Sequence, residues 1–301
     1  MTDEIVRRIE REAGVPGLAG RLSSMPGSDL RSLLLDVARR RSAERTPADL
    51  MADRSRDGTV AAALTDARPL RRAEVLALEA AEGFEALELS PVCPAGLNAV
   101  LGRIGQDSVL ATVRGSEVMA DPTAALALEA AIRRGTGDAT VRLATTHRVL
   151  RLQPLSGEGI VLRHFRLLAL VTAGPSEPGN SFETDALVDH AGVHIRLLRE
   201  TQASEIRVTV SDAARPAVAE RALERLAEAH PDVLVASDPE REHGVGYYAG
   251  AMLNVTAYTP SGDAVDLGDG GETDWTARLL QNRKERLYTS GIGLDRLVSL
   301  M

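Results

Sequence analysis

The C-terminal part of the chain, from residue 243 onward, constrains the fold more than any other stretch. Residues 247–258 combine aromatic, β-branched and small side chains, which predicts a strand. Residues 260–263 read PSGD, a turn signal, and residues 264–267 predict the returning strand. A β-hairpin is therefore expected, followed at residues 269–271 by Asp-Gly-Gly, which we interpret as a backbone hinge because glycine tolerates positive φ.

A glycine-interrupted strand comes after this hairpin. Residues 274–286 predict a helix, and residues 290–293 predict a short strand that leads into a last helical turn. This order places Arg296 beside a backbone face formed by Gly291 and Gly293. Because glycine has no side chain, a flat ring or a phosphate chain can approach such a face closely.

These features, in this order, resemble the class II aminoacyl-tRNA synthetases. The segment GIGLDRL at residues 291–297 is similar to the third signature motif of that family. The order YYAG, hairpin, DGG and GIGLDRL resembles the histidyl-tRNA synthetase branch, which also contains the regulatory subunit of ATP phosphoribosyltransferase. The resemblance covers about residues 70–300 and implies an α+β fold, an antiparallel β-sheet flanked by helices. We therefore expect an N-terminal helical segment at residues 1–69 and a synthetase-like core at residues 70–301.

The composition fits a soluble globular protein, since 44% of the residues are hydrophobic and 26% are charged. No run of about 18 apolar residues occurs, so no membrane span is expected. The charged N-terminus lacks the apolar segment of a signal peptide. The single cysteine, Cys93, excludes an internal disulfide, is expected to be a small buried residue, and fits the reducing cytoplasm.

The charge pattern argues against RNA as the main partner without excluding it. The net charge is −8, and aromatic residues, which stack on unpaired bases, make up only 3% of the chain. Residues 1–50 predict two or three short helices, and residues 51–69 predict a polar connection. The arginines at 39–41 fit the solvated end of an amphipathic helix better than a nucleic-acid patch. The role of the N-terminal segment is left open between a cap and an interface.

Residues 71–83 predict a strong helix that runs into a strand at 86–91, where Pro91 stops it. Two interpretations stay open for this unit. It is either an ordinary helix–strand pair or the counterpart of the first class II motif, which forms the dimer interface in that family. The second interpretation implies a homodimer.

The segment Asp121-Pro-Thr123 also has two interpretations. After a predicted strand at 108–113, it is well placed to cap a helix at 124–134, since the side-chain oxygens can accept from free amides. The resemblance implies a second role, because histidyl-type enzymes hold the α-amino group of the substrate with an acid and a threonine at this point. A carboxylate is a suitable counter-ion for an ammonium group.

Residues 141–175 predict a strand, a Gly/Ser/Pro-rich loop and a second strand, and they resemble the second class II motif. The resemblance implies that Arg148 grips the α-phosphate of ATP. It also matches Arg151 and Gln153 to the Arg-Pro-Gln sequence that often follows this arginine in the family. Arg163 and Phe165 match the closing strand, where the phenyl ring stacks on adenine. The alternative is an ordinary surface hairpin that carries arginines.

The chain departs from the histidyl branch where that branch reads the imidazole. Leu167 and Val171 stand at the positions of a glutamine and a glutamate, and Leu150 replaces the acid of the second motif. His243 and Gly246 replace the arginine and aspartate of the RGLDYY segment of that branch. The sequence GGETD stands where the branch has GGRYD. An apolar wall leaves imidazole nitrogens unpaired, at a cost of about 1–3 kcal/mol. We therefore expect a smaller or apolar amino acid, or another carboxylate, as substrate.

Residues 182–200 predict a helix that carries His190 and His194. No partner acid or third ligand stands out, so these histidines are interpreted as solvated residues and no metal site is expected. A strand at 205–211, a helix at 214–230 and a strand at 232–236 complete the pattern. The third motif is followed by only a few residues, so we expect no anticodon-binding domain.

Three functions follow from the resemblance. The first is ATP-dependent adenylation of a carboxylate, with Mg²⁺ bridging the phosphates and a carrier protein, small molecule, protein side chain or tRNA-like end as acceptor. The second is a catalytically silent regulator that works with a partner enzyme, and the third is direct RNA binding. The expected ATP-binding residues are Arg148, Arg151, Arg163, Phe165, Gly291, Gly293 and Arg296, with Arg148 and Arg296 catalytic; the expected substrate-binding residues are Asp121, Thr123, Gln153, His243, Tyr247, Tyr248, Gly270 and Gly271.

Overall fold

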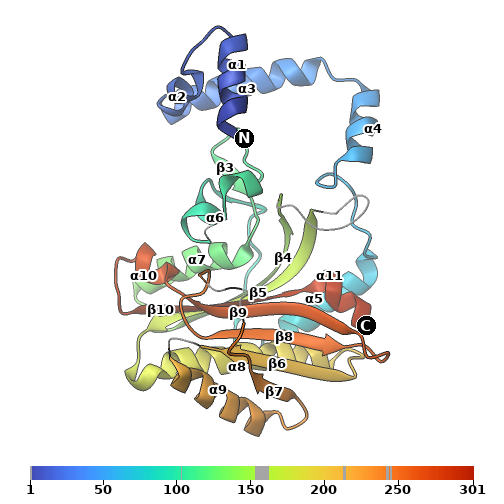
Figure 1. The fold of residues 1–301 in the computed structure, drawn as a ribbon, viewed down its shortest axis with the longest axis vertical. Helices are drawn as coiled ribbons and strands as arrows, with labels where there is room; N and C mark the ends of the chain where they lie inside the picture. Colours follow the sequence, from blue (N-terminus) through green and yellow to red (C-terminus); the bar gives the residue numbers. More distant parts are fainter. Residues whose placement is uncertain (1, 103, 153–162, 213–214, 242–243, 245) are drawn as a thin grey trace.

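One mostly antiparallel, eight-stranded sheet organises the protein, which was analysed as a computed structural model (Figure 1). The structure describes residues 2–102, 104–152, 163–212, 215–241, 244 and 246–301. The strand order is β1-β4-β5-β10-β9-β8-β6-β7, and only the β1–β4 and β6–β7 pairs are parallel. The α+β class and the antiparallel sheet expected from the sequence are confirmed. The strands are β1 (Glu85–Ala86), β4 (Val141–Leu150), β5 (His164–Pro175), β6 (Glu205–Ser211), β7 (Leu234–Ser237), β8 (Met252–Tyr258), β9 (Ala264–Thr273) and β10 (Glu285–Gly293).

Helices cover the two faces of this sheet unequally. Residues paired directly across an antiparallel ladder share a face, so the register assigns each side chain to one side. Ala144, Leu168 and Ile292 pack with α5, α8 and α9, and we call this side the α8 face. Leu143 and Ala169 pack with α7 and α10 on the opposite side, the α7 face. The helices of the core are α5 (Ala67–Ala80), α7 (Pro122–Thr136), α8 (Ser181–Arg199), α9 (Pro216–Ala229), α10 (Trp275–Leu279) and α11 (Leu294–Leu297).

The strand β10 lies between β5 and β9 and needs glycines to do so. A Cβ atom at Gly268 would collide with the carbonyl of Gly291, and one at Gly270 would lie 2.5 Å from the Cβ of Ser290. Gly270 and Gly271 lie inside β9 rather than at a hinge, and neither has a positive φ. The predicted hinge is therefore wrong, because these glycines permit close strand packing instead.

Most of the other predicted elements are found with shifted ends. The hairpin is confirmed, with its first strand starting at Met252 instead of 247 and its second running on to Thr273. The predicted helix at 274–286 ends at Leu279, because β10 already begins at Glu285, whose carboxylate pairs with Arg134 2.7 Å away. The strand expected at 86–91 is reduced to β1.

The predicted strand at 108–113 is wrong, and the buried Glu117 explains why. Its carboxylate accepts from the backbone amides of Gly96 and Asn98 and from the side chain of Gln106, which fixes the loop around it. Burial opposes the negative charge, but these hydrogen bonds outweigh it and hold the pKa of Glu117 below its usual range. Cys93 is buried beside Glu117 as expected, and burial raises the pKa of its thiol to about 11. The elements here are β2 (Val92–Pro94), α6 (Leu97–Val100), a 3-10 turn (Gln106–Ser108) and β3 (Ser116–Val118).

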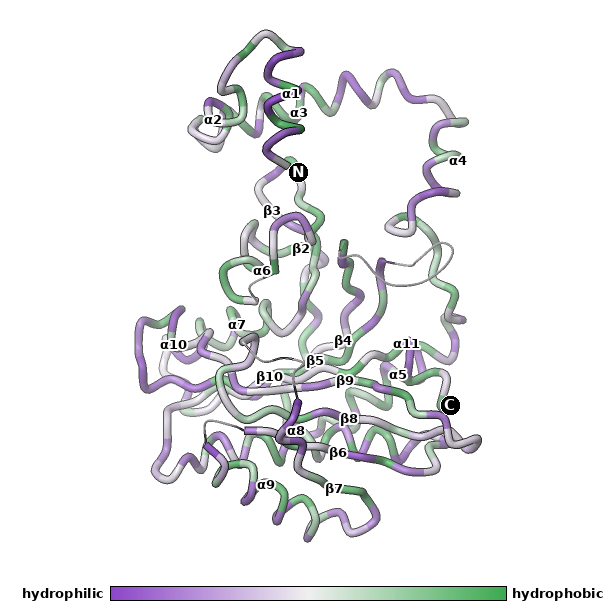
Figure 2. The backbone as a smooth tube through the Cα atoms, in the orientation of Figure 1, coloured by the Kyte–Doolittle hydropathy of each residue, from purple (hydrophilic) through white to green (hydrophobic). Residues whose placement is uncertain are grey.

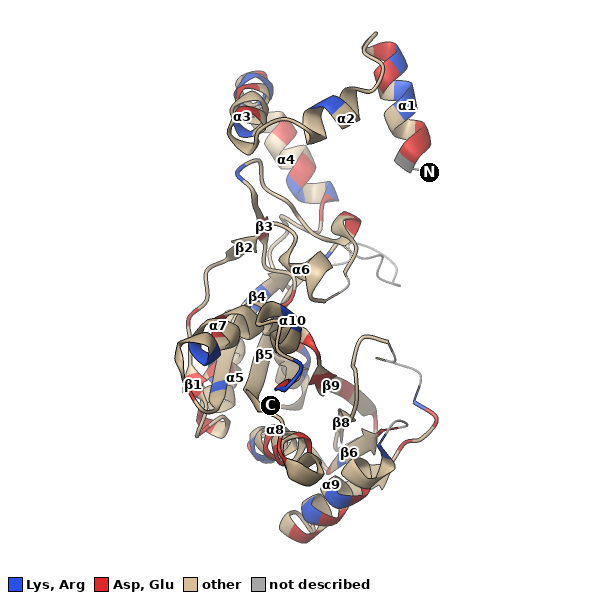
Figure 3. Ribbon diagram, turned by 90° about the vertical axis from the view of Figure 1, so that its left-hand side faces the viewer, with Lys and Arg blue, Asp and Glu red and all other residues tan. Residues whose placement is uncertain are grey.

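Four N-terminal helices form an arm that rises above the sheet in Figures 1 and 3. The last of them extends into the predicted polar connection, because Thr46 and Asp49 cap each other's backbone amides. Among the described residues of these helices, no side chain is buried. The division of the chain at residue 69 stays a prediction. The arm helices are α1 (Thr2–Glu12), α2 (Leu18–Ser23), α3 (Gly27–Ala43) and α4 (Pro47–Arg56).

The two histidines of α8 are fully buried, so the expectation that they are solvated is wrong. Both face the sheet, where Ser290 Oγ lies 2.8 Å from His190 Nδ1 and 2.9 Å from His194 Nε2. His190 Nε2 lies 2.9 Å from Thr172 Oγ1. Partners on β5 and β10, distant in sequence, therefore make burial of these rings acceptable.

An ionic cluster joins α8 and α9 to the sheet at the end of β9. The Arg215 guanidinium, at the start of α9, pairs with Glu183 at 3.3 Å and with Glu272. Arg286 pairs with the same Glu183 at 2.9 Å. The backbone of Gly250 lies against the Arg215–Glu272 pair, so a Cβ atom there would collide with both side chains.

We predict that acid weakens the fold through His194. Burial lowers its pKa from 6.5 to about 4, so the fold keeps neutral a ring that the unfolded chain protonates. Its contribution is fully present above pH 6.5 and is lost as the pH falls through 4. The free energy of unfolding should fall by about 3 kcal/mol over this range, as urea unfolding at stepped pH can measure. His194→Gln should show a smaller fall; an equal fall in both proteins would contradict the prediction.

We also predict that Gly250→Ala destabilises the protein by about 1–3 kcal/mol, because the new methyl group separates the partly buried Arg215–Glu272 pair. Thermal and urea unfolding measure the effect. Gly20→Ala is the matched control, since its methyl group meets nothing within 4 Å. Equal stability of the two variants would show that the pair does not need the glycine.

Candidate functional site

A carboxylate at the start of α7 and a tyrosine from the segment before β8 meet on the α7 face. Asp121 Oδ1 accepts from Thr123 N at 3.0 Å and Thr123 Oγ1 at 2.7 Å, so Asp121 caps the helix. Its second oxygen accepts from Tyr247 OH at 2.9 Å. Burial, and then the charge of Asp121, raise the pKa of Tyr247 well above its usual value, so the hydroxyl stays a donor. Asp121 therefore caps α7 with one carboxylate oxygen and binds the hydroxyl of Tyr247 with the other.

Tyr248 lies over β9 and belongs to a second polar chain. Its ring rests on Gly271, where an added Cβ atom would lie 2.5 Å from the ring. Its hydroxyl donates to Asp269 Oδ1 at 3.1 Å, and Arg241 Nη2 contacts Asp269 Oδ2 at 3.2 Å. Sequence reasoning missed Arg241, whose side chain is only 4% exposed. The only sequence signal was its position, two residues before His243, which the family resemblance matches to the arginine of the RGLDYY segment.

Two arginines and a phenylalanine lie at the loop end of the β4–β5 hairpin. The backbone amide of Arg151 donates to the carbonyl of Arg163 at 2.8 Å, which continues the ladder and puts both side chains on the α7 face. Arg151 Nε donates to the carbonyl of Ala120 at 2.8 Å, and its guanidinium carbon lies 5.3 Å from the centre of the Phe165 ring. Arg163 Nη1 donates to the carbonyl of Leu152 at 2.8 Å. These side chains flank the segment that carries Asp121.

Arg148 is not brought together with them. It stands three positions before Arg151 on an extended chain, and an odd spacing puts two side chains on opposite faces. Its Nη1 lies 2.9 Å from His164 Nδ1, and His164 Nε2 lies 2.6 Å from the carbonyl oxygen of Ala61. The hydrogen bonds fit a neutral imidazole that donates to Ala61 and accepts from Arg148. Arg148 thus lies on the α8 face.

Arg296 lies on α11 at the same end of the sheet as Phe165, since the preceding Asp295 accepts from the backbone amide of Arg166 at 2.6 Å. A Cβ atom at Gly293 would lie 3.8 Å from its Cγ and Cδ atoms, and Gly293 pairs with Leu167 of the same face. Its Nη1 donates to the carbonyl of Asp266 at 2.7 Å, and the side chain is exposed. Gly291 pairs with Asp269 on one side, so a glycine-lined strip runs between Tyr248 and Arg296.

Two expected site residues are not described, and two positions that differ from the histidyl branch are apolar. Gln153 and His243 lie outside the described residues. Leu167 and Val171, the positions at which the histidyl branch reads imidazole, belong to the apolar cluster of the α7 face with Tyr247 and Trp275. The described part of this face therefore carries apolar side chains at these two positions.

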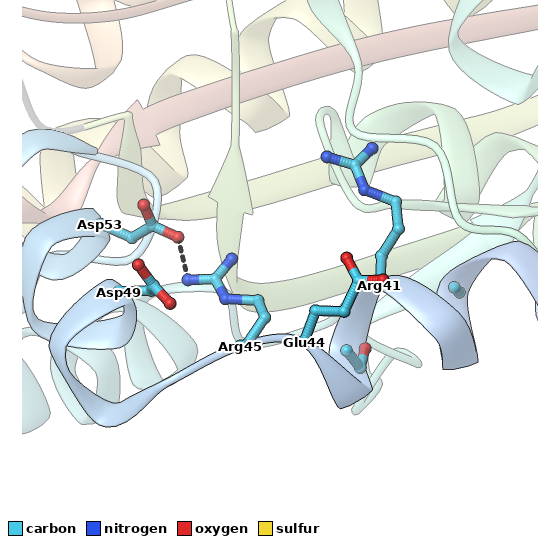
Figure 4. Close-up of a pocket in the computed structure, with 7 residues that line it drawn as sticks. Arg41, Glu44, Arg45, Asp49 and Asp53 are labelled. Atoms are coloured by element: carbon cyan, nitrogen blue, oxygen red, sulfur yellow. Dashed lines mark hydrogen bonds and ion pairs between the residues drawn. The ribbon is translucent and has the colours of Figure 1, made fainter.

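Two cavities are lined by residues other than these. One, of about 540 Å³, is lined by the end of β9, α10 and Arg283. The other, of about 530 Å³, is an open corner between α3 and α4, where Arg45 pairs with Asp53 beside Arg41 and Asp49 (Figure 4). Within the described ranges, no group of three potential metal-ligating side chains occurs. Nor does the described chain contain a helix long and apolar enough to cross a membrane.

Comparison with known proteins finds relatives by structure. No family model matches the sequence, and no curated protein matches it. An ATP phosphoribosyltransferase regulatory subunit/histidyl-tRNA synthetase from Bacillus halodurans has a TM-score of 0.61 and 14% identity, covering 77% of this chain and 79% of that one. The apo histidyl-tRNA synthetase of S. aureus has a TM-score of 0.61 and 14% identity, covering 81% and 68%.

A more distant synthetase shares the arrangement as well. The pyrrolysyl-tRNA synthetase of Desulfitobacterium hafniense has a TM-score of 0.51 and 14% identity, covering 76% of this chain and 68% of that one. At such identities the likeness concerns the fold. The protein therefore has the class II synthetase-like fold, and its structural neighbours are histidyl-tRNA synthetases and a regulatory subunit of ATP phosphoribosyltransferase.

Proposed function

We propose that the protein binds ATP along the α7 face and activates an amino acid or a similar small carboxylate by adenylation. The observation that carries this proposal is the distribution of charge on one face of the sheet. Arg151, Arg163 and Phe165 lie at the loop end of the β4–β5 hairpin, Arg296 lies beside Gly293 at the same end of the sheet, and Asp121 with Tyr247 lies beside the first group. Cations gathered at one end of a glycine-lined strip suit a phosphate chain.

Each group would have a separate task. A substrate oxygen forms a bond to the α-phosphorus, the bond from this phosphorus to the bridging oxygen breaks, and pyrophosphate leaves. Arg151 would neutralise charge at the reacting phosphate, because it shares the α7 face whereas Arg148 does not. Phe165 and Arg296 would hold the flat base between a ring and a guanidinium. Asp121 and Tyr247 would bind the ammonium group of the substrate.

The apolar wall supports a substrate other than histidine. Leu167 and Val171 offer no partner for imidazole nitrogens, and the Trp275 ring packs into the same cluster. A smaller or apolar side chain avoids the cost of unpaired polar groups. The Mg²⁺ expected with ATP would be held mainly by the phosphates, as is usual for this ion at nucleotide sites.

A second function, ligand sensing without catalysis, is favoured by two observations. Arg148 is engaged by His164 on the α8 face, and the ring of Tyr248 already rests on Gly271. A structural neighbour is the ATP phosphoribosyltransferase regulatory subunit/histidyl-tRNA synthetase of Bacillus halodurans. In that case the protein would bind a small ligand on the α7 face and act on a partner enzyme. The cytoplasmic location and the homodimer stay predictions with either function, as does a carrier-protein or other acceptor.

We predict amino-acid-dependent exchange of pyrophosphate into ATP with a small or apolar amino acid and none with histidine. Arg151→Ala should lower kcat/KM by about 100-fold or more, because it removes a donor from the reacting phosphate. Arg148→Ala is the matched control from the same strand and should keep most of the activity. Thermal unfolding of both variants separates a local effect from loss of the fold.

Two results would reject adenylation. One is no exchange with any of the twenty amino acids, and the other is an Arg151→Ala enzyme as active as wild type. If, in addition, ATP does not shift the melting temperature while a partner enzyme co-purifies with the protein, the regulatory function is supported instead. Steeply salt-dependent retention of tRNA would indicate the third function, RNA binding.

A further inference from the structure

The helices of the arm, residues 2–56, leave apolar side chains in solvent. Leu33 and Val37 of α3 are 42% and 44% exposed, and Leu50 and Met51 of α4 are 59% and 72% exposed. Short helices owe most of their stability to packing of an apolar face, and here the described arm buries no side chain. Figure 1 shows the arm reaching away from the sheet, and Figure 2 shows hydrophobic stretches in green along it. The arm therefore presents a surface that calls for a partner.

The surface on α3 is apolar and basic. Leu33, Val37 and Arg41 follow one another at a spacing of four and so share one face of the helix. Residues 31–45 contain five arginines, against the acids Asp36 and Glu44. Arg40 pairs with Asp36, but no described hydrogen bond or ion pair engages the side chains of Arg39 and Arg41. A partner with exposed apolar side chains next to free carboxylates would match this face.

Such a surface exists on α5 of the same protein. Val75 and Leu78 are 56% and 36% exposed, Glu79 continues this face of the helix, and Glu82 follows in the turn after α5. Residues 73–88 contain five glutamates and no arginine or lysine. Within the described residues, no hydrogen bond or ion pair engages the side chains of Glu79 and Glu82. The α5 surface is therefore apolar and acidic, the complement of the α3 surface.

We propose that α3 of one copy docks onto α5 of a second copy, and that the two copies exchange arms in this way. In this structure no described hydrogen bond or ion pair joins α3 to α5, and Figure 1 shows them at opposite ends of the connection. A chain that carries both complementary surfaces can form two equal contacts about a two-fold axis, which closes the assembly. Charge complementarity sets the orientation and the rate of association, while the apolar side chains supply affinity.

The connection between the arm and the core contacts two segments that carry residues of the candidate site. The carbonyl of Gly58 accepts from the backbone amide of Arg163 at 3.4 Å, and His164 Nε2 lies 2.6 Å from the carbonyl of Ala61. Thr65 Oγ1 donates to Asp295 at 2.9 Å, next to Arg296. Docking of the arm would thus steady the loop end of the β4–β5 hairpin and α11, which carry Arg163 and Arg296, whichever function the α7 face performs.

Charge reversal on the full-length protein tests the proposal. Wild type should be a dimer in analytical ultracentrifugation, weakened by salt. An arm variant, Arg39→Glu with Arg41→Glu, and an α5 variant, Glu79→Arg with Glu82→Arg, should each raise the dimer dissociation constant at least about tenfold, because like charges then meet. Mixing the two variants should restore the dimer, since each arm then faces a surface of opposite charge. Circular-dichroism melting confirms that both variants fold.

A cross-link gives an independent readout. Val37→Cys with Leu78→Cys should form a covalent dimer on oxidation, because Cys93 is buried and does not compete. Val37→Cys with Ile132→Cys, another exposed apolar position, is the matched control and should cross-link much less. A wild-type monomer, an α5 variant that dimerises as well as wild type, or a cross-link within one chain would each overturn the proposal. The last result would mean that the arm folds back onto its own α5.

Discussion

The register of β4, β5, β10 and β9 is the constraint on which the rest of the structure depends. Direct pairing across these strands fixes which side chains face α8 and which face α7, and a shift by one residue would exchange the two sets. The buried histidines and their serine belong to one side, and the arginines, tyrosines and glycine strip belong to the other. Glycines in β9 and β10 permit the close approach that this register requires.

Local patterns predicted the regular elements well and the irregular ones badly. Apolar periodicity gave the helices α5, α7, α8 and α9 and the hairpin of β8 and β9, because each is long and patterned on its own. The segment at 108–113 looked like a strand, but a buried carboxylate from residue 117 holds the loop before it, and no local pattern reveals that. The helix expected at 274–286 stopped early because the central strand starts within it.

The candidate site could be predicted in its parts but not in its arrangement. Asp121, Tyr247 and the arginine-bearing hairpin were found from the family resemblance, and the structure brings Asp121 and Tyr247 within hydrogen-bonding distance. A motif match takes no account of strand parity, so it grouped Arg148 with Arg151 although the pleat directs them to opposite faces. Arg241 was missed because its role depends on a contact with Asp269, which is distant in sequence and comes near only in the folded protein.

The position of β10 in the sheet has a consequence for the way the chain folds as it is made. This strand occupies the space between β5 and β9, although it is the last strand in sequence. On the ribosome, β4 with β5 and β8 with β9 can form as separate local pairs, but they stay unjoined until residues 285–293 have left the exit tunnel. During that interval two sheet edges stand open, each able to capture a strand from a neighbouring nascent chain.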